Sequence, residues 1–332
     1  MSAAVAAGLR PVDSVEIRIL VDNVTDSLSS VLRGVANENE VLRRYGMKVM
    51  SGAAKCCAHH GLALLVEART GDQVRTLLFD AGPDPQVLLR NAPRLGVAFG
   101  EIGAVAMSHG HWDHGGALLE AIRAIHAANG GRPVPCHLND GMLVARGNTQ
   151  PDGSVLPYEN LPGVDELRAA GAEVVSDPQA RRLLDDCFYL SGEIPRVTGY
   201  EKGYPGHLKL GADGKTWEPD PWLMDERFLA VHVRGKGAVV FTACSHAGVV
   251  NVLTEARKAF GEVPLHAVMG GFHLAGPKVE PVIDETVGDL ARFGLARIVA
   301  AHCTGWRALN RLARTFGEDV VVPGAVGRCF TF

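Results

Sequence analysis

Short runs of apolar residues recur along the whole chain, and most of them show no alternation of polar and apolar positions. Such runs predict β-strands that are covered by helices on at least one face. They lie at Val15–Leu20, Leu62–Glu67, Thr76–Phe79, Ala104–Met107, Phe228–Val233, Ala238–Phe241, Leu265–Met269, Ile298–Ala301 and Val320–Val322.

Helical patterns of apolar residues lie between these runs. Ala117–Ala128 places its leucine and isoleucine residues on one face, and Gly130 and Gly131 then end the pattern. Similar patterns cover Val249–Phe260, Val279–Phe293 and Trp306–Phe316. The alternation of strands and helices predicts a layered α/β architecture.

Two stretches interrupt this rhythm. Asp22–Gly61 has little strand character, and Asn139–Asp225 is rich in Gly, Pro, Asp and Tyr. A connection as long as the second one, between core elements, is usually functional or disordered. We therefore expect a single domain over residues 1–332, with an insertion at about 139–225 that covers a cleft.

Composition narrows the classes of function. The 33 Lys and Arg residues against 37 Asp and Glu leave a formal charge of −4, without the basic excess that nucleic acids or anionic membranes attract. No apolar run reaches the roughly 20 residues that a membrane span needs, and the first residues do not resemble a secretory signal. Seven scattered cysteines are not a disulfide framework. These features favour a globular cytoplasmic protein with a small-molecule substrate.

The most informative segment follows the strand predicted at Ala104–Met107. His109, His111, Asp113 and His114 occur within six residues, directly before a pair of glycines. Imidazole and carboxylate groups suit Zn²⁺, Mn²⁺ or iron, and four of them at the end of one strand predict a metal site. No Gly-x-Ser-x-Gly or Walker-type segment offers a rival nucleophile or phosphate site.

The pattern His-x-His-x-Asp-His resembles the signature of the metallo-β-lactamase fold superfamily. The resemblance implies a four-layer αββα sandwich with one or two metal ions between the sheets. His at position 111, where the flavodiiron branch would have Glu, favours the hydrolase type. Asp80, at the end of another apolar run, resembles the aspartate that braces the metal loop in this superfamily.

Further short sequence segments, spread over roughly residues 15–330, are similar to segments of one branch of the superfamily. This branch is described as similar to dihydropterin-ribofuranosylaminobenzene-phosphate synthase. The similarity is specific for the fold and the metal but weak for the substrate, so function has to be argued from the site. The segments are Val21-Asp-Asn23, His60-Gly-Leu, the stretch from Ser108 to Gly116, Cys244-Ser-His246-Ala-Gly, Gly270-Gly-Phe-His273-Leu and His302-Cys-Thr-Gly305.

The resemblance implies that His109, His111, Asp113 and His114 are ligands, together with His302. Many superfamily hydrolases also have a Gly-His-Thr-Pro-Gly segment and a Gly-Asp whose carboxylate bridges two metals, and this chain has neither. Ala243-Cys-Ser-His246 stands in the place of the bridging Asp, so we expect His246 to be the missing ligand. Cys244 could ligate as a thiolate, but a small buried strand residue is the favoured interpretation.

Several residues are candidates for contact with the substrate. His273 could be a ligand, a substrate-facing acid or base, or a core histidine, and we assign it a catalytic role beside Asp113. Arg196 could hold an anionic group, although a structural ion pair is the alternative. The candidate substrate-binding residues are His60, Arg196, Cys244 and His207.

The sequence therefore favours a metal-dependent hydrolase that uses activated water on a phosphoester, lactone or other ester. One or two zinc ions are expected, with iron and manganese as alternatives. A transferase or lyase acting on a pterin or ribosyl-phosphate compound is the second hypothesis, and a binding protein without turnover is the third. We expect a small-molecule substrate, which can be anionic, and no nucleic-acid or membrane partner. The sequence leaves the formation of a homo-oligomer open.

Overall fold

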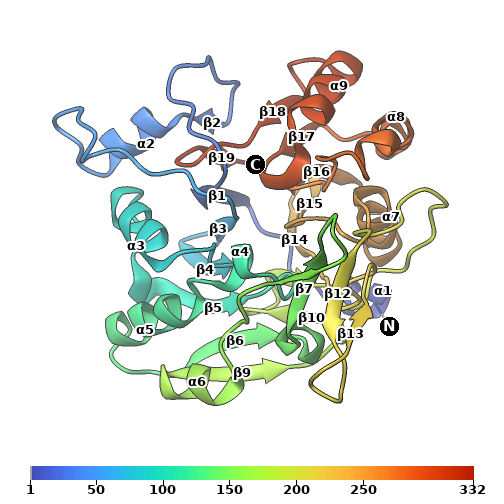
Figure 1. Cartoon of the computed structure of the whole chain (residues 1–332). Helices are drawn as coiled ribbons and strands as arrows, with labels where there is room; N and C mark the ends of the chain where they lie inside the picture. The colour runs from blue at the N-terminus through green and yellow to red at the C-terminus, as the bar shows by residue number, and fades with distance from the viewer. Residues whose placement is uncertain (1) are drawn as a thin grey trace.

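The computed structural model describes residues 2–332 as two facing β-sheets with helices on both outer sides (Figure 1). The first sheet has eight strands in the order β2-β19-β1-β3-β4-β5-β6-β9. Its strands are β2 (Val35–Ala36), β19 (Cys329–Thr331), β1 (Ser14–Val21), β3 (Ala63–Thr70), β4 (Gln73–Phe79), β5 (Ile102–Ala106), β6 (Val134–Leu138) and β9 (Ala172–Ser176). The strands β4, β5, β6 and β9 run parallel to one another.

The second sheet has seven strands in the order β10-β11-β14-β15-β16-β17-β18. The strands from β15 to β18 are parallel. The bounds are β10 (Arg181–Leu183), β11 (Phe188–Leu190), β14 (Leu229–Val233), β15 (Gly237–Phe241), β16 (Leu265–Gly270), β17 (Arg297–Ala300) and β18 (Val321–Pro323).

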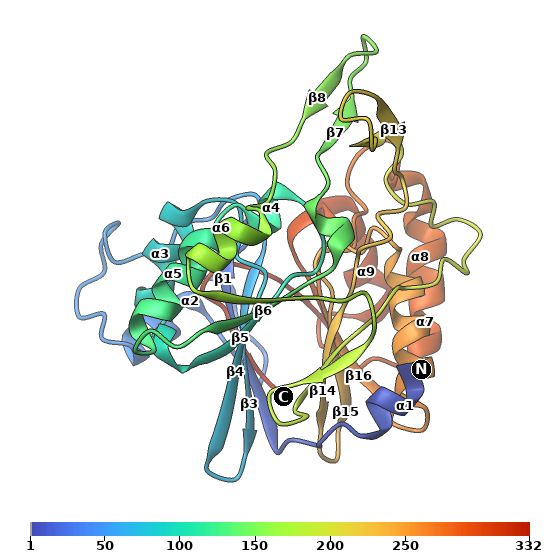
Figure 2. The same cartoon turned by 90° about the horizontal axis from the view of Figure 1, so that it is seen from below.

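Helices cover the outer face of each sheet, as the view in Figure 2 shows. The first sheet packs against α2 (Glu38–Arg44), α3 (Pro85–Arg94), α5 (Leu118–Ala128) and α6 (Val164–Ala169). The second packs against α1 (Ser2–Ala7), α7 (Val249–Phe260), α8 (Ile283–Leu290) and α9 (Trp306–Phe316). A third apolar cluster, with Ile17, Phe79 and Phe241 among its members, fills the space between the sheets. The predicted four-layer αββα sandwich is therefore confirmed.

Local sequence explains where several helices begin. Asp84 precedes α3, and its carboxylate accepts a hydrogen bond of 2.6 Å from the backbone N–H of Gln86, while Pro85 takes the first helical position. Asn37 and Glu40 form a reciprocal capping box at the start of α2. Within residues 2–332 no helix is long and apolar enough to cross a membrane.

A third, four-stranded sheet stands apart from the sandwich, at the top of Figure 2. Its order is β13-β12-β7-β8, with β13 (Trp217–Pro219), β12 (His207–Leu210), β7 (Arg146–Thr149) and β8 (Val155–Pro157). It lies inside the insertion predicted at about 139–225. However, α6 and the strands β9, β10 and β11 also come from that stretch and complete the sandwich. The predicted insertion therefore has to be divided, because residues 164–190 belong to the core.

The parallel strands place all candidate metal ligands at one edge of the sandwich. β4 and β5 end next to each other in the first sheet, and β15, β16 and β17 end next to one another in the second. Ligands of α/β sheets collect at the carboxyl ends of parallel strands, where the connecting loops open. The short helix α4 (Trp112–Gly115), which carries Asp113 and His114, begins in this edge region.

Candidate metal centre

The loop between β5 and α4 carries the four clustered candidate ligands in a buried position. His109 and His114 are fully buried, and His111 and Asp113 are 5% and 6% exposed. The rings of His109 and His111 have their centroids 4.6 Å apart, and those of His109 and His114 are 4.4 Å apart. Buried polar side chains need hydrogen-bond partners or a bound ion. These imidazole rings pack against one another without an acidic partner for each, which indicates a metal centre.

Asp80 orients two of these rings. Its Oδ2 accepts hydrogen bonds from the Nδ1–H of His114 at 2.8 Å and from the hydroxyl of Ser108 at 2.7 Å. The Ser108 oxygen lies 2.8 Å from Nδ1 of His109 and accepts its proton, because the hydroxyl hydrogen already points to Asp80. In their neutral forms both histidines therefore carry the lone pair on Nε2, which is directed away from Asp80. Burial opposes protonation of His114, but Asp113 and Asp80 outweigh it and raise its pKa to about 9, so a bound cation has to displace a proton from this ring. This arrangement is the one in which a carboxylate supports metal-bound histidines.

Asp113, His114, Cys244 and His302 form one group of potential ligands. Their ligand atoms all lie within 4.8 Å of one another. Nε2 of His302 is 3.3 Å from Asp113 Oδ2, and Nε2 of His114 is 3.2 Å from Cys244 Sγ. Nδ1 of His302 lies 3.0 Å from Oδ1 of Asn23 and donates to it, so the ring presents Nε2 to the group.

His109, Cys244 and His246 form a second group within the same distance limit of 4.8 Å. Nε2 of His109 and both ring nitrogens of His246 are buried without a hydrogen-bond partner. An orphaned imidazole nitrogen is costly in a protein interior, because its lost hydration is not replaced. A metal ion fits these atoms. Cys244 belongs to both groups, which places its thiol between the two candidate sites.

Two buried carboxylates hold the loop that carries His246. Glu226 accepts hydrogen bonds from the backbone N–H groups of His246 at 2.8 Å and Ala247 at 2.6 Å. Glu201 accepts from the first turn of α7, which begins after Gly248. Gly248 has a φ of +94°, and a Cβ there would lie 2.0 Å from Glu201 Cδ, so only glycine fits. The loop is therefore held from both sides.

Left-handed backbone conformations concentrate at this edge of the sandwich. The non-glycine residues Asp80, Ser245, His273 and His302 have φ values of +57°, +59°, +44° and +48°. Each follows the end of a core strand. Such conformations cost on the order of 1–3 kcal/mol each and are typical of functional sites.

The ionisation states favour cation binding. Burial, together with neighbouring imidazoles, lowers the pKa values of His109, His111 and His246 well below the usual range, so these rings are neutral at pH 7. Burial alone would raise the pKa of Asp113, but His114, His302 and other neighbours outweigh it and hold that pKa well below its usual range. Neutral imidazoles and an ionised carboxylate are the forms that bind metals.

Asp113 and His302 from the first group, His246 from the second, and the shared Cys244 line a cavity of about 480 Å³. Trp112, Tyr158 and Tyr204 supply aromatic wall, and Asn23, Asn148 and Gln150 supply amide groups. The lining residues in the described part of the chain include neither Lys nor Arg. The predicted site residues that line it are His60, His111, Asp113, Cys244, His246, His273 and His302.

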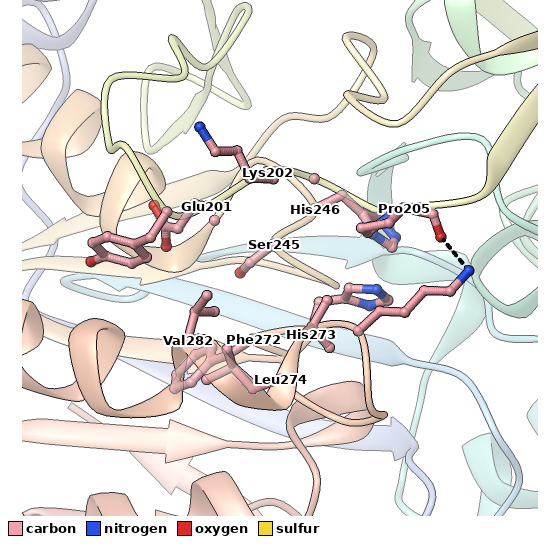
Figure 3. Close-up of a pocket in the computed structure, with 14 residues that line it drawn as sticks. Glu201, Lys202, Pro205, Ser245, His246, Phe272, His273, Leu274 and Val282 are labelled. Atoms are coloured by element: carbon pink, nitrogen blue, oxygen red, sulfur yellow. Dashed lines mark hydrogen bonds between the residues drawn. The ribbon is translucent and has the colours of Figure 1, made fainter.

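His246 and His273 line both this cavity and a second one of about 190 Å³. Figure 3 shows the ring of His273 beside that of His246, with Glu201 at the opposite end of the smaller cavity. The centroids of the two histidine rings are 4.4 Å apart. Sγ of Cys303, Sγ of Cys244 and a ring nitrogen of His273 also lie within 4.8 Å of one another. His273 thus lies beside the candidate ligands and faces the cavity.

His60 stands at the mouth of the larger cavity. Its side chain is 53% exposed, and its Nε2 lies 3.4 Å from Asp113 Oδ2. The ring centroid is 4.9 Å from that of His302. This position is compatible with the predicted contact to substrate.

Arg196 is not placed as predicted. Its guanidinium donates to the carbonyl oxygens of Ile194, Trp222 and Leu223, and it lies outside the residues described as lining the larger cavity. These backbone acceptors use the planar donor group that the prediction had assigned to a substrate anion. We therefore correct the assignment: Arg196 stabilises the chain around residues 222–223.

Cys244 and His207 occupy positions that differ from the simple substrate contact expected for them. Cys244 is 3% exposed, which agrees with the favoured interpretation of a small buried residue, and its Sγ also lies among the candidate ligand atoms. His207 is 1% exposed and contacts His111. Sequence reasoning overlooked Arg146, Asp225 and Glu226, which hold the ligand loops. The charged triplet Asp225-Glu226-Arg227 directly before an apolar strand was the available signal.

The comparisons with solved structures agree with this geometry. The chain is similar, with a TM-score of 0.69 and 21% identity, to Tm1679, described as a metal-dependent hydrolase of the beta-lactamase superfamily; the match covers 96% of this chain and 98% of that one. Unliganded yeast PDE1 is similar with a TM-score of 0.52 and 11% identity, over 97% and 100% of the two chains. The chain therefore has the metallo-β-lactamase fold.

One relative resembles the sequence itself. The chain is 28% identical over 265 residues to the 7,8-dihydropterin-6-methyl-4-(beta-D-ribofuranosyl)-aminobenzene-5'-phosphate synthase of Methanocaldococcus jannaschii. The alignment covers 79% of this chain and 86% of that protein. No protein-family model matches the sequence. The predicted sequence similarity to this branch is therefore confirmed.

His246→Ala tests the ligand that the sequence alone singled out. We expect at least the roughly 10–100-fold loss of metal affinity that follows loss of a partner of a metal ligand, because both ring nitrogens are orphaned beside His109. Titration of the chelator-treated protein with Zn²⁺ measures the metal affinity of the variant and of the unaltered chain. His266→Ala is the matched control, since His266 lies on β16 beside Phe332 and outside the site. Unchanged affinity in His246→Ala would move the assignment to His273.

Proposed function

We propose that this chain is a metal-dependent hydrolase that acts on an ester-type bond of a small molecule. The observation that carries the proposal is the convergence of unpaired ligand atoms at the wall of one cavity. Two groups of imidazole, carboxylate and thiol donors meet at Cys244, and Nε2 of His109 and both nitrogens of His246 have no other partner. The metallo-β-lactamase fold of the chain supports the same class of activity.

The donor residues can be divided between two candidate metal sites. His109 and His246 would hold a first ion, together with His111 as the sequence motif predicts. Asp113, His114 and His302 would hold a second, with Cys244 between the two sites. A bound divalent transition-metal ion would supply activation of water and polarisation of a carbonyl or phosphoryl oxygen. Nitrogen, oxygen and sulfur donors together favour zinc, with iron and manganese as the alternatives.

The remaining polar residues orient the reacting groups. Asp113 takes part in the site through Oδ2, which faces both His60 and His302. His273 is positioned to deliver a proton to a leaving group, because its ring borders the cavity between His246 and Tyr204. Asp80 keeps the rings of His109 and His114 in the tautomers that ligation needs.

The lining of the cavity indicates the kind of substrate. Aromatic side chains and amides bind planar groups and neutral polar groups well. Since the described lining has no Lys or Arg, any negative charge on the substrate would have to be met by the metal site itself. We therefore favour a small carboxylic ester, lactone or phosphodiester with a planar group over a phosphomonoester dianion.

A substrate panel tests the proposal. Metal-reconstituted protein should hydrolyse at least one of a p-nitrophenyl phosphodiester, an aromatic lactone and a thioester, and the chelator-treated protein should not. Re-addition of Zn²⁺ should restore the rate, because the ion supplies the activated water. Equal rates before and after chelation would contradict a metal-dependent reaction.

A second candidate function follows from the sequence relative. The likeness to a synthase of a dihydropterin-ribofuranosylaminobenzene phosphate favours a transferase or lyase that acts on a pterin or ribosyl-phosphate compound. The aromatic wall formed by Trp112, Tyr158 and Tyr204 would accept a pterin ring. Tight pterin binding without turnover of the hydrolase panel would favour this function over the first.

A further inference from the structure

The third sheet touches the metal-ligand loop itself, not only the cavity above it. His207, the first residue of β12, has its Nε2 2.9 Å from Nε2 of His111. Its Nδ1 lies 2.8 Å from the backbone carbonyl oxygen of Asp220, at the end of β13. The His207 side chain has no exposed surface. It is therefore a buried histidine with both ring nitrogens engaged.

These two contacts determine where the protons lie. A carbonyl oxygen can only accept, so Nδ1 of His207 carries the proton and donates to Asp220. Nε2 of a neutral His207 is then an acceptor, and the short contact requires Nε2 of His111 to carry a proton. His111 consequently keeps its lone pair on Nδ1. The chain of hydrogen bonds thus selects the His111 tautomer that can bind a metal through Nδ1.

The backbone between the two ligand histidines is held by the same region. Gly110 donates its N–H to Asp225 Oδ2 at 2.9 Å, and its carbonyl accepts from Nη1 of Arg146 at 3.1 Å. Arg146 and Asp225 also pair with each other, and both are almost fully buried. A Cβ at Gly110 would lie 2.1 Å from Arg146 Nη1 and 2.3 Å from the Met142 carbonyl, so a side chain there would displace the arginine.

Arg146 and His207 come from neighbouring strands of the third sheet. β7 pairs with β12 in antiparallel register, in which His207 faces Asn148 and Lys209 faces Arg146. One sheet thus positions both the ring of His111 and the peptide unit before it. Figure 1 shows β7 and β12 side by side in this sheet.

We propose that the third sheet is a structural part of the first metal site, in which His207 is a positioning residue that fixes the tautomer and orientation of His111. The inference rests on the metal centre proposed above and deepens it. It assigns the sheet a role in metal binding beyond any contact with substrate. It also explains why a residue so far along the chain from the ligand motif is a buried histidine.

Metal titration of the full chain tests this role, with His207→Ala, His207→Gln and Asn148→Ala compared with the unaltered protein. Co²⁺ and Zn²⁺ are the probes, and the absorption spectrum of bound Co²⁺ reports the ligands. His207→Ala should weaken the first site by roughly 10–100-fold and leave the second within about threefold. His207→Gln should recover most of the loss and the cobalt spectrum, because the amide oxygen can accept from Nε2 of His111.

Asn148→Ala is the matched control, since Asn148 lies opposite His207 in the sheet and lines the cavity. It should bind metal like the unaltered protein. A His207→Ala protein that behaves like Asn148→Ala would overturn the inference. So would a His207→Gln protein as weak as His207→Ala with an altered cobalt spectrum, since His207 would then be a ligand. If the unaltered protein binds no metal, the proposed metal centre fails instead.

Discussion

Replacing Asp113 with asparagine is expected to remove the second metal ion and to lower metal-dependent hydrolysis by more than about 100-fold. Asparagine keeps the volume of the side chain but cannot supply the negative charge. Oδ2 of Asp113 lies 3.3 Å from Nε2 of His302, 3.4 Å from Nε2 of His60 and 3.8 Å from Nε2 of His114. The carboxylate is therefore the central acidic group of this cluster.

Metal analysis and the hydrolase panel measure this result together. Asp165→Asn is the control, because Asp165 on α6 is fully exposed and belongs to neither ligand group. The circular dichroism spectrum of the metal-free Asp113→Asn protein should match that of the unaltered chain, because asparagine preserves the packing. Its thermal stability should fall, because the contacts of the carboxylate with His114 and His302 are lost. Two bound ions and full activity in Asp113→Asn would refute the assignment of the second site.

The arrangement of the core could be predicted because its signals are long and local. α7 and α9 coincide with the predicted helices at Val249–Phe260 and Trp306–Phe316. Each has more than two turns of regular spacing, which is enough to define a buried face. The core strands that were predicted are similarly marked by apolar runs that end in polar residues.

The elements that were missed have short or interrupted patterns. β10 and β11 have three residues each, so no period can be recognised in either. Their membership of the second sheet depends on pairing with distant residues, such as that of Leu190 with Leu229. α3 contains Pro93 in its interior, and an interior proline weakens a helical pattern in the sequence.

The site shows the same division between local and distant information. The motif from His109 to His114 predicts a metal-binding loop, because four potential ligand residues lie together in the sequence. The partners that orient those donors are remote: Asp80 lies 34 residues from His114, and His207 lies 96 residues from His111. Only the folded arrangement shows which polar side chains reach them. Arg196 illustrates the converse, since its acceptors are carbonyl groups that no sequence pattern marks.

Cys244 is the residue at which this chain departs most from the pattern that its sequence resembles. The segment from Ala243 to His246 stands where the sequence analysis expects a bridging aspartate, and the structure places Sγ of Cys244 within 4.8 Å of the ligand atoms of both groups. Burial raises the pKa of this thiol well above its usual range, so a bound cation has to displace its proton. A thiolate at that point would favour zinc or iron over manganese.

Replacing Cys244 with serine is expected to lower the affinity for both ions by more than about 100-fold, because one side chain serves both groups. In the cobalt-loaded protein the charge-transfer absorption of a thiolate ligand should be present in the unaltered chain and absent from this variant. Cys244→Asp should bind two ions again without that absorption, since a carboxylate can bridge them. Cys303→Ser is the matched control: its Sγ lies 3.4 Å from that of Cys244 but outside both ligand groups of the proposed sites. If Cys244→Ser keeps full metal content, or Cys303→Ser loses as much, Cys244 does not join the two sites.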